Sequence, residues 1–96
     1  MPIYAVQYVY DPNRNDDRDT HRPEHRGYLQ SLADEGSMLV RGPYSDHGAA
    51  GALLVLRADP PDAVAAALDP DPFNREGLIL DRVVREWNPI GNDVFG

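Results

Sequence analysis

The chain has 96 residues, a net charge of −7, 42% hydrophobic residues and 26% charged residues. This length predicts one domain, residues 1–96, with a thin core, and the negative charge argues against binding to nucleic acid or to anionic membrane surfaces. The chain contains no cysteine and no lysine, which excludes disulfides, a thiol nucleophile, a Cys-ligated metal site and a lysine Schiff base.

Residues 3–10 read IYAVQYVY, a run of mostly apolar, β-branched and aromatic side chains. Such a run predicts a strand that is covered on both faces or lies at the centre of a sheet. The start of the chain has neither the basic region nor the apolar core of a signal peptide. No stretch approaches the roughly 20 apolar residues of a membrane span. We therefore expect a cytoplasmic protein without a membrane segment.

Residues 11–20 are polar and charged, and they predict a long loop that serves as a lid or is disordered. A helix is expected to begin near Thr20 to Pro23, because Asp19 or Thr20 can cap it and proline is tolerated in a first turn. Apolar residues at helical spacing predict its buried stripe: Tyr28, Leu29, Leu32 and Ala33. Gly36 is predicted to end the helix in a left-handed conformation.

The rest of the chain predicts three more strands and one more helix. In chain order these are strands at 37–41 and 51–57, a helix at 61–68 and a strand at 78–87. The second and third strands are expected to form a hairpin with a longish loop that contains a turn at 45–48. The segment DPDPF at 69–73 breaks the second helix, and residues 88–96 are expected to form a tail.

The predicted order is β-α-β-β-α-β. It favours an α+β, ferredoxin-like domain, in which two helices cover one face of a four-stranded antiparallel sheet. The other face would expose apolar side chains of the first and third strands, and an exposed apolar area of that size is typical of an interface. We therefore predict a symmetric homodimer that is closed face to face through the sheets.

Four segments together resemble the YciI-like family: Arg22–Leu29 (RPEHRGYL), Leu32–Gly36, Arg41-Gly42-Pro43 and Asp71-Pro72-Phe73. In that family an R-P-x-H segment opens the first helix and a D-P-[FY] signature follows the second. The resemblance implies a ferredoxin-like fold, a dimeric α+β barrel, and an active site with a His and an Asp. Relatives include a dehydrochlorinase that acts on a chlorinated hydroxyhydroquinone, and the wider fold includes muconolactone isomerase. The acidic segment 13–21, with a second histidine at its end, departs from the family pattern.

His25 is the first candidate for chemistry. It is expected near the N-terminus of the first helix, whose partial positive charge disfavours the imidazolium form, and a neutral imidazole can act as a general base. The alternative is a half-exposed surface histidine. Such a base needs a carboxylate to orient it. Asp34 lies about 13–14 Å further along the same helix and on its opposite side, so Asp71 is the preferred partner, unless it only caps a turn.

Four further residues are predicted to bind a substrate: Tyr8, Arg22, Ser45 and Phe73. Ser45 follows Gly42-Pro43, and it either donates a hydrogen bond to a substrate oxygen or shapes the turn. Tyr8 and Phe73 either line a small apolar pocket or belong to the core. Arg14 and Arg18 either close over an anionic substrate or pair with the aspartates beside them.

We therefore predict a cofactor-independent lyase or isomerase that acts on a small cyclic or enolisable molecule by His25 general acid/base catalysis with Asp71. The competing hypothesis is a non-catalytic small-molecule-binding or accessory domain of a metabolic pathway, and an oligomerisation element comes third. No metal site is predicted, because the three histidines are scattered: His21, His25 and His47. The expected partners are the substrate and a second copy of the chain.

Overall fold

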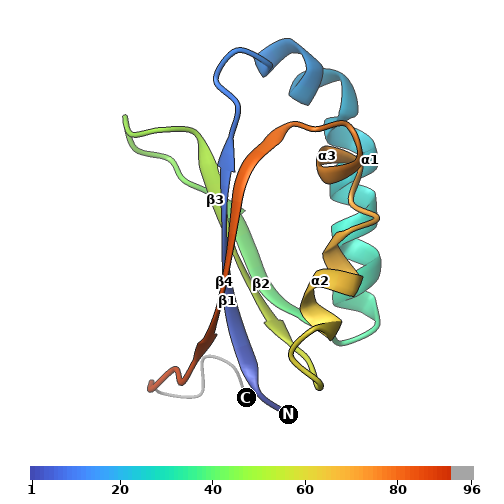
Figure 1. Ribbon diagram of the computed structural model, residues 1–96, viewed down its shortest axis with the longest axis vertical. Helices are drawn as coiled ribbons and strands as arrows, with labels where there is room; N and C mark the ends of the chain where they lie inside the picture. Colours follow the sequence, from blue (N-terminus) through green and yellow to red (C-terminus); the bar gives the residue numbers. More distant parts are fainter. Residues whose placement is uncertain (92–96) are drawn as a thin grey trace.

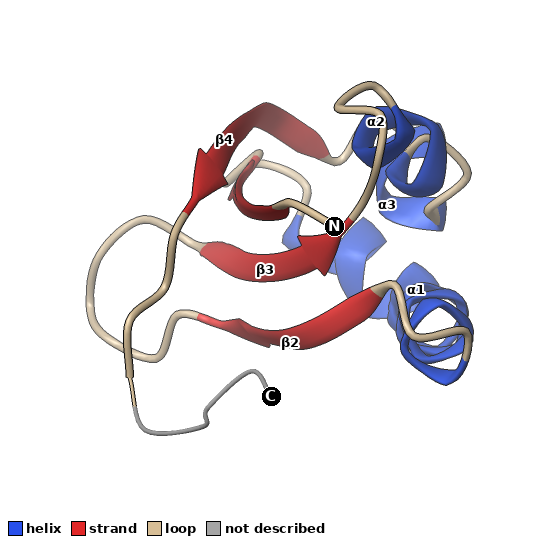
Figure 2. Cartoon of the chain, turned by 90° about the horizontal axis from the view of Figure 1, so that it is seen from below, coloured by secondary structure: helices blue, strands red, loops and turns tan. Residues whose placement is uncertain are grey.

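The computed structural model describes residues 1–91. Its elements in chain order are β1 (Ile3–Tyr10), α1 (Asn15–Asp34), β2 (Met38–Pro43), β3 (Gly51–Arg57), α2 (Ala63–Leu68), α3 (Pro72–Arg75) and β4 (Ile79–Trp87). The strands form an antiparallel sheet in the order β2-β3-β1-β4. The helices lie on one side of it (Figures 1 and 2). The α+β, ferredoxin-like architecture predicted from the sequence is therefore confirmed.

The apolar strand β1 lies at the centre of the sheet, because it pairs with β3 on one side and with β4 on the other. Alternate residues of β1 are buried on the face that the helices cover: Tyr4, Val6, Tyr8 and Tyr10. They pack in one core with Leu54 and Leu56 of β3 and with Leu29 of α1. The prediction of a central strand over residues 3–10 is confirmed.

The first helix begins earlier than the sequence predicted. α1 begins at Asn15, so residues 11–20 are not one long loop, and the expectation of a start near Thr20 is wrong. Side chains three residues apart contact each other along its N-terminal turns, in the pairs Arg14–Asp17, Arg18–Asn15 and Arg22–Asp19. Two acidic residues, Asp16 and Asp17, also lie in the first turn, where they complement the partial positive charge of the helix.

Pro23 lies inside α1 rather than in its first turn. A proline there removes one helical hydrogen bond, and its ring crowds the preceding turn, which bends a helix. Figure 1 shows the first turns of α1 running at an angle to the rest of the helix. These turns carry Arg18, whose guanidinium carbon lies 4.6 Å from the centre of the Tyr10 ring.

The remaining boundaries differ from the prediction by a few residues. β2 continues through Gly42-Pro43, and a proline is tolerated there because β2 is an edge strand. The helix predicted at 61–68 begins only at Ala63, and the segment at 69–73 leads into the short helix α3. Gly36 ends α1 with a positive φ of 89°, as predicted. Of the tail predicted at 88–96, residues 92–96 lie outside the described part of the chain.

The face of the sheet opposite the helices is partly apolar and exposed. Side chains on it include Val40, Leu53, Val83 and Trp87, which are 39–46% exposed. Their positions follow from the strand register, in which Leu53 pairs with Gln7, Gln7 with Val83, and Ile3 with Trp87.

Within residues 1–91, no helix has the length and hydropathy needed to cross a membrane.

Candidate functional site

Asp71 is a fully buried carboxylate at the start of α3. Its backbone is extended (φ −52°, ψ 127°), its Oδ1 accepts the Phe73 N–H at 3.0 Å, and Pro72 opens the helix. Asp is a preferred residue at this position, and proline is preferred directly after it. The sequence Asp-Pro-Phe therefore fixes the carboxylate in the core through a local cap.

The same Oδ1 atom lies 2.7 Å from Nδ1 of His25. The His25 ring is stacked on Phe73, with 3.8 Å between ring centres and 3° between planes, and His25 is only 8% exposed. The structure thus brings the two predicted residues together, and the alternative of a half-exposed surface histidine is excluded. Of the two roles considered for Asp71, cap and histidine partner, the carboxylate fulfils both.

His25 does not lie near the start of α1, because the helix begins ten residues earlier at Asn15. The partial charge of a helix end acts only over the first turn. The expectation that the helix N-terminus sets the state of this imidazole is therefore wrong. What surrounds the ring is Asp71 on one edge and Phe73 on one face.

Tyr8 lies beneath the pair, and its hydroxyl donates to Oδ2 of Asp71 at 3.3 Å. Burial, followed by the negative charge of Asp71, raises the pKa of Tyr8, so its O–H remains a donor. With the His25 ring and the Phe73 N–H, three hydrogen-bonding groups surround one buried carboxylate. This arrangement satisfies a group that is costly to bury alone.

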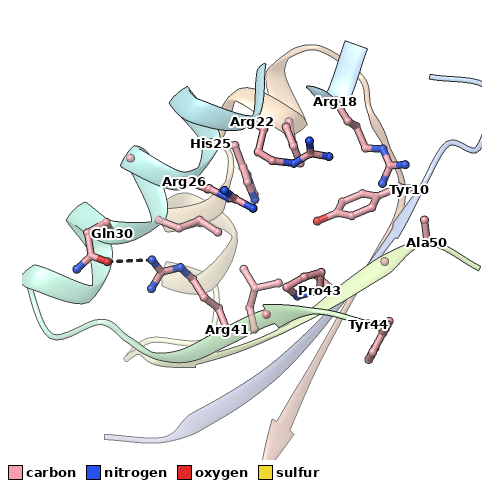
Figure 3. Close-up of a pocket in the computed structure, with 17 residues that line it drawn as sticks. Tyr10, Arg18, Arg22, His25, Arg26, Gln30, Arg41, Pro43, Tyr44 and Ala50 are labelled. Carbon is pink, nitrogen blue, oxygen red and sulfur yellow. Dashed lines mark hydrogen bonds between the residues drawn. The ribbon is translucent and has the colours of Figure 1, made fainter. Parts of the chain in front are cut away.

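A cavity of about 750 Å³ lies between α1 and the sheet, and His25 is one of the residues that line it. Figure 3 shows side chains of α1, including Arg22, His25 and Arg26, facing Tyr10 and Arg41 from the strands. Within residues 1–91, Nε2 of His25 has no hydrogen-bond partner. A histidine with Nδ1 held by a carboxylate and Nε2 unengaged at a cavity has the geometry of a general base.

The other predicted site residues divide into two groups. Arg22 and Phe73 line the cavity. Tyr8 is fully buried, so it supports Asp71 rather than the cavity wall. Ser45 lies exposed in the β2–β3 loop and is not among the lining residues. Asp34, set aside as a partner for His25, accepts a hydrogen bond from Gln30 at the surface.

Sequence reasoning missed Tyr10, Arg26 and Arg41 as lining residues. Burial and the nearby charge of Asp71 raise the pKa of Tyr10 to about 12, and Arg18 opposes this shift. The available signal was the four-residue spacing of Arg18, Arg22 and Arg26, but a loop predicted over 11–20 concealed it.

No cluster of three or more His, Asp or Glu side chains suited to a metal ion occurs in the described part of the chain.

Solved structures share this fold at low sequence identity. The dehydrochlorinase TftG from Burkholderia phenoliruptrix AC1100, which acts on 5-chloro-2-hydroxyhydroquinone, is 24% identical with a TM-score of 0.79, over 90% of this chain and 93% of that one. That structure is a complex with 2,5-dihydroxybenzoquinone. PA3566 from Pseudomonas aeruginosa is 13% identical with a TM-score of 0.57, over 95% of this chain and 96% of that one. These likenesses show the fold alone.

No curated protein matches the chain. The family model of the YCII-related domain matches residues 3–88. This range includes both members of the His25–Asp71 pair and every strand and helix of the fold. The resemblance noted from the sequence segments is thereby confirmed, and the chain belongs to the YCII-related domain family.

Proposed function

We propose that this protein is a cofactor-independent lyase or isomerase that moves a proton on a small cyclic or enolisable molecule. The observation that carries the proposal is the 2.7 Å contact between Nδ1 of His25 and Oδ1 of Asp71 beside a cavity. A histidine oriented by a carboxylate is a recurrent arrangement for general acid/base catalysis.

The chemistry follows from the tautomer that Asp71 selects. In the neutral ring, Nδ1–H donates to Asp71, so Nε2 carries the lone pair. Nε2 takes a proton from an acidified carbon of the substrate, and the C–H electron pair becomes an enolate or a new double bond. The imidazolium then returns the proton to another carbon in an isomerase. In a lyase, the electron pair expels a leaving group, and the proton passes to that group or to water.

Two surrounding groups support this reaction. Asp71 stabilises the imidazolium that forms, because its carboxylate already accepts a hydrogen bond from the ring. Phe73 covers one face of the ring and restricts its rotation. The dehydrochlorinase with the same fold acts on a hydroxylated ring, which supports a cyclic, enolisable compound as the kind of substrate to test first.

The test is proton exchange in D₂O, followed by ¹H NMR on a panel of small cyclic ketones and hydroxylated cyclic acids. We expect at least one compound to exchange faster than in buffer. General acid/base catalysis contributes about 10²–10⁴-fold in rate, so His25→Ala should lose about 10²-fold or more.

The matched control is His47→Ala, because His47 lies exposed in the β2–β3 loop and does not line the cavity. This variant should exchange as fast as the unmodified protein. If His25→Ala retained full activity, or if no compound exchanged faster than in buffer, the proposal would be abandoned.

We also infer that the protein is a homodimer, with a second copy covering the exposed sheet face. Apolar side chains such as Leu53 and Val83 lie there 39% exposed, and so small a chain has little core of its own. A two-fold interface must be self-complementary. This face carries both signs of charge, which supports such an interface, because the register places both Asp81 and Arg85 of β4 on it beside the apolar residues.

A further inference from the structure

Four arginines line the cavity of a protein that is acidic overall. The chain has a net charge of −7 and only nine arginines, yet Arg18, Arg22, Arg26 and Arg41 all lie at this cavity. Of the described residues that line it, none is Asp or Glu. The interior of the cavity therefore has the opposite charge to the molecule as a whole.

Three of these arginines follow one another at four-residue spacing on α1: Arg18, Arg22 and Arg26. Side chains four apart on a helix are neighbours, and like charges at this spacing destabilise it. At the start of α1 opposite charges do lie close together, as in Arg14 and Asp17, and within this series Arg22 pairs with Asp19. A negative ligand between the helix and the sheet would offset the repulsion between these arginines, which explains why they lie together at a cavity.

These arginines also have few partners of opposite charge. Within residues 1–91, no carboxylate lies within ion-pair distance of Arg18, Arg26 or Arg41; only Arg22 has one, the exposed Asp19. The Nε of Arg18 is buried without a hydrogen-bond partner among the same residues.

The arginines reach the cavity from two sides. Arg41 extends from β2 to α1, where its NH2 group donates to Oε1 of Gln30 at 3.0 Å. In Figure 3, Arg18 and Tyr10 lie at one end of the cavity and the Arg41–Gln30 pair lies at the other, with His25 between them. A ligand beside His25 is therefore within the field of positive groups on both sides.

The rest of the wall suits a small apolar body. Leu29, Leu54, Pro43 and Phe73 contribute to it, and a volume of about 750 Å³ lies within the roughly 300–1,000 Å³ typical of small-molecule sites. Guanidinium groups bind carboxylates with paired, charge-assisted hydrogen bonds.

We infer that the ligand of this cavity is a small organic carboxylate with a cyclic apolar body, and that the arginines of α1 and β2 select it. The inference deepens the proposed function, because it names the class of substrate that His25 would act on. Carboxylate binding itself does not require that His25 be catalytic.

The test is isothermal titration calorimetry with a matched pair of probes, 4-hydroxybenzoate and its neutral analogue 4-hydroxybenzamide. We expect the carboxylate to bind at least tenfold more tightly than the amide. Its affinity should also fall as NaCl is raised from 20 to 200 mM, because salt screens charge attraction. Equal affinity for the two probes, or no measurable binding of the carboxylate at millimolar concentration, would overturn the inference.

The variants Arg18→Gln and Arg41→Gln remove one charge each from opposite ends of the cavity. One carboxylate reaches one end of the cavity at a time, so at least one of the two variants should raise the Kd for 4-hydroxybenzoate about tenfold, as expected for the loss of a charge-assisted hydrogen bond. The matched control is Arg75→Gln, because Arg75 is 58% exposed, pairs loosely with Glu24 and does not line the cavity. Two arginine variants that bind like this control would contradict the inference.

His25→Ala separates this inference from the proposed function. It should slow proton exchange by about 10²-fold or more but keep the preference for the carboxylate probe. A protein that prefers the carboxylate but accelerates no exchange would leave the ligand class standing and remove the catalytic proposal. A protein that accelerates exchange on neutral ketones and shows no carboxylate preference would remove the ligand class and leave the catalytic proposal standing.

Discussion

Nδ1 of His25 lies 2.7 Å from Oδ1 of Asp71, although the two residues are 46 positions apart in the chain. Two independent local structures meet at this contact. His25 is presented by the long helix α1, and Asp71 is held in place by its own cap on α3. The contact is thus made between two side chains whose backbones are already fixed, which is the preorganisation that proton transfer requires.

Asp71→Asn separates the role of the charge from the role of the cap. Asn is as good a cap as Asp, so α3 should form, but the charge-assisted bond to His25 is lost. We expect proton exchange to fall about 10²-fold or more and the free energy of unfolding to fall by about 1.5–3 kcal/mol. Exchange rates and urea unfolding measure the two effects, and Asp34→Asn at the helix surface is the control. Unchanged exchange in Asp71→Asn would contradict the assignment.

The free energy of unfolding should depend on pH at alkaline values because Tyr8 and Tyr10 are buried. Burial raises the pKa of Tyr10 to about 12 from about 10 in an unfolded chain, and that of Tyr8 is raised as well. Between pH 10 and 12 the unfolded chain has therefore lost a proton that the folded chain keeps. Stability should be unaffected by these groups below pH 10 and should fall as pH rises above it, by up to about 1.4 kcal/mol per pH unit for each tyrosine.

Urea unfolding at pH 9, 10 and 11 measures this slope. Tyr10→Phe removes one of the two groups, so its stability should fall less steeply above pH 10 than that of the unmodified protein. An identical slope in the two proteins would show that Tyr10 does not take part.

Gly51→Ala should weaken the pairing of β3 with β1. A Cβ atom at Gly51 would lie 2.3 Å from the carbonyl oxygen of Tyr8, so the backbone of one strand must move. We expect a loss of about 1–3 kcal/mol, seen as a fall of about 4–8 °C in Tm per kcal/mol. Gly42→Ala is the matched control, because nothing lies within 4 Å of a Cβ there. Equal Tm values for the two variants would refute this reading of the close approach.

The dimer proposal predicts that a charge on the open sheet face separates the two copies. Leu53→Glu should sediment as a monomer in analytical ultracentrifugation, since it places a carboxylate in an apolar interface. Ala66→Glu, on the exposed side of α2, should retain the mass of the unmodified protein. If the unmodified protein is itself a monomer at micromolar concentration, the dimer proposal is wrong. If Leu53→Glu remains a dimer, the two copies associate through another surface.

The sequence by itself determined the order of the four strands and of the helices α1 and α2, but not the short helix α3. The apolar run at 3–10 predicted a strand but not which of its faces meets the helices, whereas Leu29 and Leu32 repeat as a helix requires. It also indicated His25 and Asp71 as a pair, through the two family segments that contain them. The start of α1 was missed, because a charged segment with an internal proline has the composition of a loop. In the structure this segment is helical, and side-chain pairs such as Arg14–Asp17 lie at its start.

Only the tertiary structure decided what surrounds the pair. It placed Tyr8 beneath Asp71 and left Ser45 at the surface. It also placed Arg41 of β2 at the same cavity as Arg18 of α1. The physical reason is that a contact between distant segments depends on sheet order, helix bend and register together. A repeat along the chain specifies which face of an element is buried, but not which side chain of another element it meets.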